Sequence, residues 1–222
     1  MQRIPEPELM DAPEQARAYA EADFAEPNQL FSTAVAEQLA GTDPGKLIDL
    51  GCGPGDIPIR LAGALPGWSI IGLDAGPNML ALARQAVAAA DLQDRIELVL
   101  ALLPEHGMDQ RFDAVVSNSL LHHLPDPMSL WHSVADLTRP GGYVQIMDLH
   151  RPDSTARARW LVDEHAAGAP EILRQDFYNS LLAAWTIEEV RQQFEAAGLH
   201  ELRLSRPTER HWMASGFVRT TA

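Results

Sequence analysis

Short apolar runs alternate with helix-period segments through the middle of the chain. The apolar runs cover residues 47–50, 70–73, 96–103, 114–116 and 143–147. The intervening segments that carry apolar side chains at helical spacing cover residues 57–65, 77–90 and 128–137. Strands that alternate with helices are joined by right-handed crossovers into a parallel sheet, and unbroken apolar runs fit strands buried on both faces. The pattern predicts an α/β fold with a doubly wound, three-layer sheet.

Both ends of the chain are predicted to be largely helical. Near the start, residues 14–24 form an alanine-rich helix, and Asn28 caps a second helix that runs to residue 40. After the last apolar run, residues 155–168 and 172–185 have helical patterns. These helices flank the predicted sheet.

The last part of the chain predicts one more helix and two strands. Thr186 and Glu189 have the spacing of a capping box that opens a helix, and Gly198 can close that helix. Residues 201–205 and 212–218 resemble strands joined by a turn. We expect this pair to form an antiparallel hairpin at the edge of the sheet.

Composition and charge narrow the classes of partner. Lysine and arginine total 17 residues against 31 aspartates and glutamates, which gives a formal net charge of −14. Nucleic-acid binding takes most of its affinity from cations on phosphates, and the sequence has no basic stripe. We therefore expect neither a nucleic acid nor an anionic membrane surface as a partner.

The start of the chain and the single cysteine indicate a cytoplasmic protein. Residues 1–11 contain Glu6 and Asp11 and no apolar run, so we expect no signal peptide. No stretch approaches the roughly 20 apolar residues that a membrane-spanning helix needs. Cys52 has no second cysteine to pair with inside the chain, which fits a reducing compartment.

The strongest motif is a glycine-rich turn after the first apolar run. Gly51, Gly53 and Gly55 follow the strand at alternate positions, and a helix follows them. Glycine permits a sharp turn and close approach of a ligand. A second buried strand ends in Asp74, and in a doubly wound sheet the ends of these two strands lie side by side where ligands bind. A carboxylate there can accept hydrogen bonds from both hydroxyls of a ribose, so we predict a nucleoside site.

Two classes of cofactor use such a site. Dinucleotides favour a third glycine six positions along, where this chain has Asp56, whose negative charge opposes a pyrophosphate. Asp49, just before the loop, can instead act through the loop on a cationic ammonium group, or it can merely cap the loop backbone. Asp56 and Asp49 together favour a cofactor in which a nucleoside is joined to an amino acid.

Four motifs in order resemble those of the class I S-adenosylmethionine-dependent methyltransferases, in particular those that methylate small molecules. The motifs are residues 47–55, residues 72–74 with 77–79, residues 112–118 with 121–124, and residues 139–142 ahead of the fifth strand. The resemblance covers residues 46–148. It implies a Rossmann-like sheet of seven strands with the last strand antiparallel, S-adenosylmethionine as cofactor and S-adenosylhomocysteine as product.

The resemblance also implies roles for individual residues. Gly51, Gly53 and Gly55 would approach the methionine portion, and Asp74 would hold the ribose. The remaining residues expected near the cofactor are Ala75, Met79, Ala101, Leu102 and Asn118. Ala75 and Met79 would lie near the adenosine and Asn118 beside the methionine moiety, although Met79 is equally explained as core packing. Leu100 stands where the family often has an acid for the adenine, so contact with the base would rely on the backbone near Ala101 and Leu102.

The resemblance sets the expected organisation of the chain. We expect one domain over residues 1–222, with N-terminal helices over 1–45, a cofactor-binding core over 46–150 and acceptor-side elements over 151–222. Tyr19 and Asp23 in the first helices either cover the pocket as a lid or lie on the surface. The sequence leaves open whether the protein is a monomer or a homodimer.

Two adjacent histidines are the candidates for catalysis. His122 and His123 follow the fourth strand, near the expected position of the methyl acceptor, and histidine can accept a proton near neutral pH. The alternative is that the pair only shapes the loop. His150, after the fifth strand, is a similar candidate. No metal site is predicted, because Asp148 is followed by Leu149 and not by a second oxygen ligand.

The predicted function is transfer of a methyl group to a small molecule by in-line displacement. A first alternative is a non-catalytic S-adenosylmethionine binder that senses the cofactor or supports a partner protein. A second alternative is a nicotinamide-dependent oxidoreductase, which Asp56 disfavours. The identity of the acceptor and its reacting atom are left open by the sequence.

Overall fold

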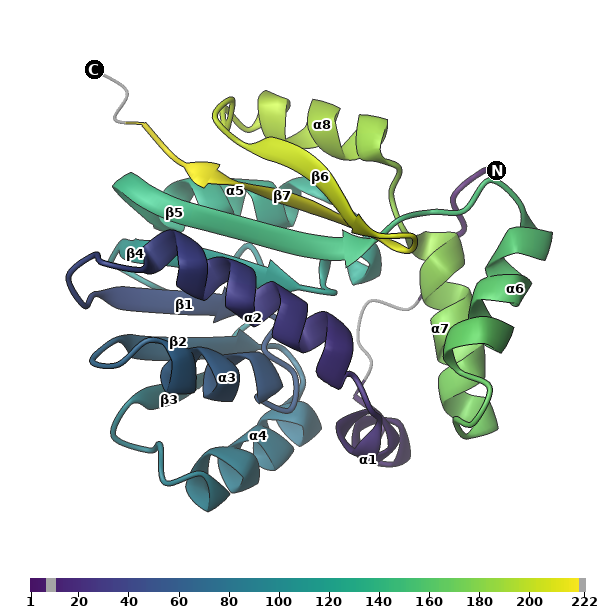
Figure 1. The fold of residues 1–222 in the computed structure, drawn as a ribbon, viewed down its shortest axis with the longest axis horizontal. Coiled ribbons are helices and arrows are strands. Elements are labelled where there is room, and N and C mark those ends of the chain that lie inside the picture. Colours follow the sequence, from purple (N-terminus) through teal and green to yellow (C-terminus); the bar gives the residue numbers. More distant parts are fainter. Residues whose placement is uncertain (7–10, 220–222) are drawn as a thin grey trace.

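A seven-stranded mixed sheet organises the protein (Figure 1), as seen in a computed structural model that describes residues 1–6 and 11–219. The strands are β1 (Lys46–Leu50), β2 (Ser69–Asp74), β3 (Ile96–Leu100), β4 (Phe112–Asn118), β5 (Thr138–Leu149), β6 (Arg203–Thr208) and β7 (His211–Phe217). Their order is β3-β2-β1-β4-β5-β7-β6, in which β1 to β5 pair in parallel and β7 is antiparallel to both neighbours. The predicted fold class is confirmed.

Helices cover both faces of the sheet. One face carries α2 (Ala25–Leu39), α3 (Asp56–Ala64) and α4 (Pro77–Ala89), and the other carries α5 (Met128–Leu137) and α8 (Ile187–Ala196). Side chains alternate along β1, so that Leu47 packs with Phe31 of α2 while Ile48 packs with Trp131 of α5. Figure 1 shows α2 and α3 in front of the sheet. This double cover explains the unbroken apolar runs of the central strands.

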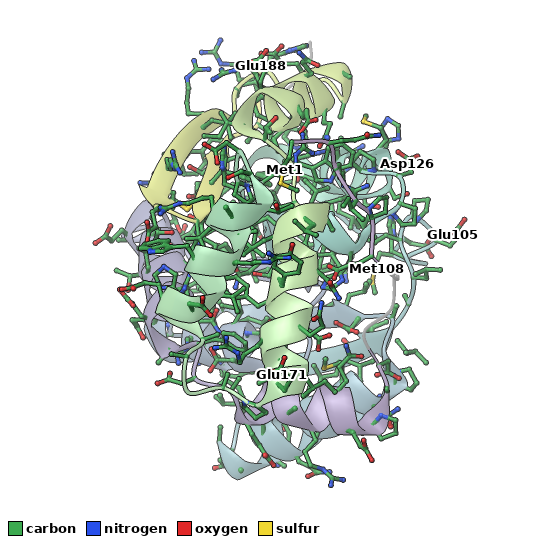
Figure 2. The ribbon with its side chains drawn as sticks, turned by 90° about the vertical axis from the view of Figure 1, so that its right-hand side faces the viewer. Met1, Glu105, Met108, Asp126, Glu171 and Glu188 are labelled. Carbon is green, nitrogen blue, oxygen red and sulfur yellow. The ribbon has the colours of Figure 1, made fainter. Side chains whose placement is uncertain are left out.

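Three further helices lie beyond the carboxyl ends of the parallel strands. They are α1 (Pro13–Glu21), α6 (Thr155–His165) and α7 (Glu171–Ala183). Figure 2 looks onto this end, with α7 running up from Glu171. α1 packs against α4 and α7, and α6 and α7 share a small apolar cluster with Leu149. The helices therefore form a cover over the edge of the sheet where the strands end.

The strand order creates a crevice under that cover. From β1 the chain crosses to β2 on one side, and after β3 it returns to β4 on the other side. Ligands in open α/β sheets bind at such a reversal of strand order, outside the carboxyl ends of the strands. The crevice therefore lies between the ends of β1 and β4.

Most predicted elements are present, with several corrections. β5 begins at Thr138 and so includes residues 139–142, predicted as a turn ahead of the strand, and β6 covers Arg203–Thr208 and not 201–205. Asn28 does not cap α2: the helix begins at Ala25, and the Asp23 carboxylate accepts a 3.0 Å hydrogen bond from the Ala25 N–H. The strand predicted over 96–103 ends at Leu100, because the chain turns away from β2 there. The capping box of Thr186 and Glu189 is confirmed.

The C-terminal strand pair is present as predicted. β6 and β7 form the predicted antiparallel pair, and β7 joins it to β5.

Residues 7–10, part of the start expected to lack a signal peptide, lie outside the described residues. In the described parts of the chain, none of the helices combines the length and apolar character of a membrane span.

Candidate active site

The crevice between β1 and β4 opens into a cavity lined by the loops that follow β1, β2, β3 and β4. Its lining includes Gly51, Gly53, Asp74, Ala75, Met79, Ala101, Leu102 and Asn118. Residues of α1 and the start of α2, among them Tyr19, Phe24 and Asn28, close the opposite side. Predicted cofactor residues after β1, β2, β3 and β4 thus line one cavity, and N-terminal residues cover it.

The glycine-rich loop depends on backbone conformations that other residues rarely adopt. Gly53 has a φ of +51°, and a Cβ placed there would meet no protein atom within 4 Å, so that side of the residue faces open space. Gly55 has a φ of +91°, and its Cβ would lie 3.3 Å from the Cβ of Ala83 in α4. Gly53 therefore leaves room in the cavity, while Gly55 allows α3 and α4 to pack closely.

Asp74 holds the two loops of the site together. Its carboxylate accepts hydrogen bonds from the Gly53 N–H at 2.8 Å and from the Gly76 N–H at 2.7 Å. Burial raises the pKa of Asp74, and the hydrogen bonds from Gly76 and Gly53 oppose the shift. The side chain still lines the cavity, so it organises the loops and faces the space between them.

Asp49 lies beneath the loop and away from the cavity surface. It is 1% exposed, and neither carboxylate oxygen accepts a hydrogen bond from the described residues. Burial, and secondarily the charge of Asp74, raises the pKa of Asp49 to about 8. Neither Asp49 nor Gly55 is among the residues that line the cavity. Any influence of Asp49 on a ligand would therefore pass through the loop.

Asn118, at the end of β4, lies where the first cavity meets a second one. Its Nδ2 donates a 3.0 Å hydrogen bond to Oδ1 of Asn28, while its own Oδ1 is buried and accepts none from the described residues. Asn28 also donates to the Asp56 carboxylate at 2.8 Å. Asn28 was predicted only as a helix cap, and no sequence signal pointed to its place in the site.

The second cavity adjoins the first on the side of α6 and α7. The two share the following lining residues: Tyr19, Ala22, Asp23, Phe24, Asn28, Asn118, Ser119 and His123. The second cavity continues between apolar side chains of Leu149, Leu173 and Phe177. Tyr19 and Asp23 thus line both spaces.

His122 and His123 form a one-turn 3₁₀ helix, η1 (Leu121–His123), at the wall of the second cavity. The Nδ1 atom of His122 lies 2.5 Å from Oδ1 of Asp148, and the His122 backbone N–H donates to Oδ2 at 3.1 Å. Burial lowers the pKa of His122, but the Asp148 and Glu6 carboxylates outweigh it and the net shift is upward. Burial raises the pKa of Asp148, but His122 outweighs it and the net shift is downward. Asp148 therefore fixes the orientation of the His122 ring.

Two residues near the chain start contact the histidine pair. Oε1 of Glu6 lies 3.5 Å from Nε2 of His122 and 3.2 Å from Nδ1 of His123. Arg3 donates to the His122 carbonyl at 2.9 Å and to the Ala183 carbonyl at 2.5 Å. The sequence revealed neither contact, because no local pattern links Glu6 or Arg3 to a loop more than a hundred residues away.

His150 is not part of either cavity lining. It forms an isolated bridge with Trp185, and its N–H donates to the Arg210 carbonyl at 2.7 Å. Burial, with Arg206 and Arg151 nearby, lowers its pKa. The structure therefore separates His150 from His122 and His123, with which the sequence grouped it.

Comparison with known proteins identifies the family. A methyltransferase domain profile matches residues 48–144. The ubiquinone biosynthesis O-methyltransferase of Salmonella arizonae is 30% identical over 185 residues, which cover 78% of this chain and 72% of that protein. The chain belongs to the S-adenosylmethionine-dependent methyltransferases.

Solved methyltransferases share the fold of this methyltransferase. An O-methyltransferase family protein from Burkholderia thailandensis superposes with a TM-score of 0.73 at 19% identity, over 94% of this chain and 60% of that one. Haemonchus contortus phosphoethanolamine N-methyltransferase 2, solved with S-adenosylhomocysteine, gives 0.70 at 15% identity, over 95% of this chain and 58% of that one. The methyltransferase thus spans about three fifths of these two solved chains.

The cofactor of the methyltransferase is S-adenosylmethionine, and the first cavity fits its chemistry. The open space beside Gly53 admits a ligand close to the backbone. The buried Oδ1 of Asn118 offers an acceptor to a cationic ammonium group. The carboxylate of Asp74 offers acceptors at the end of the neighbouring strand. The residues present thus suit both a charged amino-acid portion and a ribose.

Proposed function

We propose that this methyltransferase methylates a hydroxyl group of a small molecule held in the second cavity. The observation that supports the proposal is the junction of the two cavities at Asn118, Ser119 and His123. A cofactor in the first cavity would present its reactive end at that junction. An acceptor in the second cavity would meet it there, shielded by α1 and α7.

In this proposal the residues of the first cavity bind and orient the cofactor. Asp74 accepts hydrogen bonds from the ribose hydroxyls, and Asn118 accepts one from the ammonium group. Gly51 and Gly53 bring the backbone close to the methionine portion, while Met79, Ala75, Ala101 and Leu102 surround the adenosine. Gly55 supports the loop by packing on α4, and Asp49 supports it from below.

The transfer itself needs alignment more than strong chemical activation. S-adenosylmethionine supplies a methyl group on a sulfonium, and in-line attack by the acceptor oxygen forms a C–O bond while the C–S electron pair returns to sulfur. The protein holds the acceptor oxygen about 3 Å from the methyl carbon and excludes water. Tyr19 and Phe24, whose rings are 4.7 Å apart, cover the junction and exclude water from it.

Two observations favour oxygen as the acceptor atom. The curated relative with 30% identity is an O-methyltransferase. A hydroxyl must lose its proton during transfer, and His122 and His123 line the cavity in which the acceptor would lie. We therefore assign the two histidines to the reacting end of the acceptor.

The walls of the second cavity suggest the character of the acceptor. Leu149, Leu173 and Phe177 supply apolar surface on the side of α7, where Asp176 also lines the cavity, and the histidines lie near its junction with the first cavity. A compact molecule with an apolar body and a hydroxyl at one end matches this distribution. A large polymer does not match a cavity covered by α1 and α7.

A competition experiment tests the proposal. The protein is incubated with methyl-labelled S-adenosylmethionine and with matched series of aromatic alcohols, amines and thiols, and labelled products are identified by mass spectrometry. We expect label on the alcohols. Label on the amines or thiols alone would contradict oxygen as the acceptor atom, and label on proteins alone would contradict a small-molecule acceptor.

A further inference from the structure

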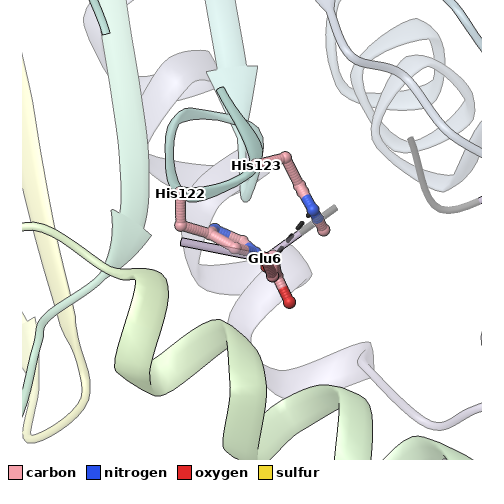
Figure 3. A group of neighbouring side chains, drawn as sticks. All are labelled: Glu6, His122 and His123. Atoms are coloured by element: carbon pink, nitrogen blue, oxygen red, sulfur yellow. Dashed lines mark ion pairs between the residues drawn. The ribbon is translucent and has the colours of Figure 1, made fainter. Parts of the chain in front are cut away.

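We infer that Glu6, His122 and His123 form a binding site for a divalent transition-metal ion at the wall of the acceptor cavity. Figure 3 shows the three side chains converging from the N-terminal segment and from η1. Their candidate ligand atoms are one carboxylate oxygen and two imidazole nitrogens, all within 4.8 Å of one another.

The distances suit a single ion. Transition metals bind histidine nitrogen and carboxylate oxygen at about 2.0–2.2 Å, which places neighbouring ligand atoms about 3–3.5 Å apart. Oε1 of Glu6 lies 3.2 Å from Nδ1 of His123 and 3.5 Å from Nε2 of His122. Small side-chain rotations therefore bring the three atoms around one ion.

A buried carboxylate orients one of the ligands. Asp148 is 1% exposed, and its Oδ1 lies 2.5 Å from Nδ1 of His122. Histidines that bind metals almost always donate their second ring N–H to a carboxylate, carbonyl or water. This contact turns Nε2 of His122 toward Glu6. Asp148 is thus a positioning residue for the proposed site.

The charges around the three side chains are compatible with a bound cation. Glu6 and Asp148 supply two carboxylates next to the histidines, and the charge of the Arg3 guanidinium acts on both Glu6 and His122. Arg3 directs its N–H groups to the carbonyls of His122, Leu124 and Ala183. The charge of Arg3 thus acts on the carboxylates through space, and Glu6 and Asp148 both stay beside the histidines.

The ligand types favour zinc, iron, cobalt, nickel or copper over magnesium. Imidazole nitrogen suits these metals, whereas magnesium prefers sites made of oxygen ligands and water. Two histidines and one carboxylate also leave coordination positions open, as in catalytic sites. Because His122 and His123 line the second cavity, these positions would face the acceptor.

The proposed metal site extends the proposed function. Its effect on the acceptor rests on that function, whereas binding of the ion does not. An acceptor hydroxyl that binds to the ion would have a lowered pKa, so it would release its proton to the solvent as it enters the cavity, before the methyl transfer. The sequence predicts no metal site, because Asp148 is followed by Leu149. Glu6 is brought to the histidines only by the fold.

Metal titration without cofactor or acceptor tests the site separately from the proposed function. Tag-free protein is stripped with a chelator and titrated with Zn²⁺ by calorimetry and with Co²⁺ by visible absorption. We expect one ion per chain and the d–d bands of a cobalt ion bound by nitrogen and oxygen. Glu6→Gln and His123→Asn should each weaken binding at least about tenfold, and Asp148→Asn should weaken it about 10–100-fold.

His165→Asn is the matched control. His165 lines the same cavity, but its Nε2 pairs with Glu209 at 2.9 Å and lies outside the proposed ligand set. This variant should bind Zn²⁺ like the wild type. Absence of binding in the wild type would overturn the proposal, as would equal affinity in Glu6→Gln. If His123→Asn does not fold, Glu6→Gln and the wild-type cobalt spectrum decide the question.

Discussion

The carboxylate of Asp74, at the end of β2, accepts a 2.8 Å hydrogen bond from the backbone N–H of Gly53, in the loop after β1. A second hydrogen bond, from Gly76, ties the same carboxylate to its own loop. One side chain thus connects the two loops that line the cofactor cavity. Any ligand that bridges β1 and β2 meets an acceptor whose position is already set.

Replacing Asp74 should weaken cofactor binding strongly. Asp74→Asn removes a charged acceptor from the cavity, and charged hydrogen bonds each contribute about 1.5–3 kcal/mol. We expect the affinity for S-adenosylhomocysteine to fall about 100-fold, as measured by calorimetry. Asp136→Asn, an exposed acid on α5, is the control and should bind like the wild type. Unchanged affinity in Asp74→Asn would mean that the ribose is held elsewhere.

Two substitutions in the glycine-rich loop should separate an effect on the free energy of unfolding from an effect on cofactor binding. Gly55→Ala places a Cβ 3.3 Å from Ala83 at a φ of +91°, so it should lower the free energy of unfolding by about 1–3 kcal/mol. Gly53→Ala directs its Cβ into open space beside the cavity, so it should weaken S-adenosylhomocysteine binding at least about tenfold.

Urea unfolding and calorimetry on the two glycine variants check this separation. The stability loss in Gly53→Ala should stay near the roughly 1 kcal/mol cost of the left-handed backbone. Under conditions in which both variants are folded, Gly55→Ala should bind S-adenosylhomocysteine more tightly than Gly53→Ala does. The reverse order of affinities would show that Gly55, and not Gly53, approaches the ligand.

The raised pKa of Asp49 should make the stability of the protein depend on pH. Its pKa is about 8 in the folded protein and near 3.8 in the unfolded chain, so the folded state binds one more proton between these values. Stability of the ligand-free protein should therefore fall as pH rises through this window, by about 1.4 kcal/mol per pH unit from this group alone. Below the window both states are protonated, and above it both are ionised, so the contribution becomes constant.

The difference between wild type and Asp49→Asn isolates that contribution. Asparagine occupies the same volume without a titrating charge, so the stability of the variant relative to the wild type should increase steadily from pH 5 to pH 8. Chemical unfolding at several pH values without cofactor gives this difference directly. A difference that does not change with pH would show that Asp49 is ionised throughout.

A buried network on the α2 side of the sheet predicts a loss of stability without a loss of binding. Gln145 is fully buried, accepts a 2.7 Å hydrogen bond from the Tyr143 hydroxyl and donates one at 2.9 Å to the Phe31 carbonyl. Gln145→Leu leaves a buried hydroxyl without this partner and should lower the free energy of unfolding by about 1–3 kcal/mol.

Cofactor binding should be unaffected in Gln145→Leu, because Gln145, Tyr143 and Phe31 do not line either cavity. Tyr143→Phe removes only one donor and should cost less, about 1 kcal/mol. Thermal or urea unfolding measures both effects. Loss of S-adenosylhomocysteine affinity in Gln145→Leu at a temperature where it is folded would contradict the separation of this network from the site.

The central sheet and the cofactor wall were predictable because their signals are local. β1 is apolar apart from Lys46 and Asp49 and leads directly into Gly51. β2 is a largely apolar strand that ends at Asp74. The parallel pairing of neighbouring strands then places those residues side by side. The boundary of β3 was less predictable, since residues 101–103 are as apolar as the strand itself and only the path of the chain ends the pairing.

The roles of Gly55 and Asn28 depended on packing between helices. Gly55 belongs to the same motif as Gly53, yet it faces Ala83 of α4 and not the cavity. Asn28 suits a helix cap by residue type, yet it lies inside α2 and joins Asp56 to Asn118. Residue type predicts which hydrogen bonds a side chain can make, but its neighbours come from the way α2, α3 and α4 pack.

The sequence by itself determined the α/β architecture, the cofactor class and the position of Asp74, because hydrophobic periodicity and loop motifs act over a few neighbouring residues. Only the tertiary structure decided that Asp148 orients His122 and that Glu6 reaches both histidines. These groups lie 26 or more residues apart, and no periodic pattern relates them. Their meeting follows from how β5 ends beside η1 and from the course of the N-terminal segment, both of which are set by packing across the whole chain.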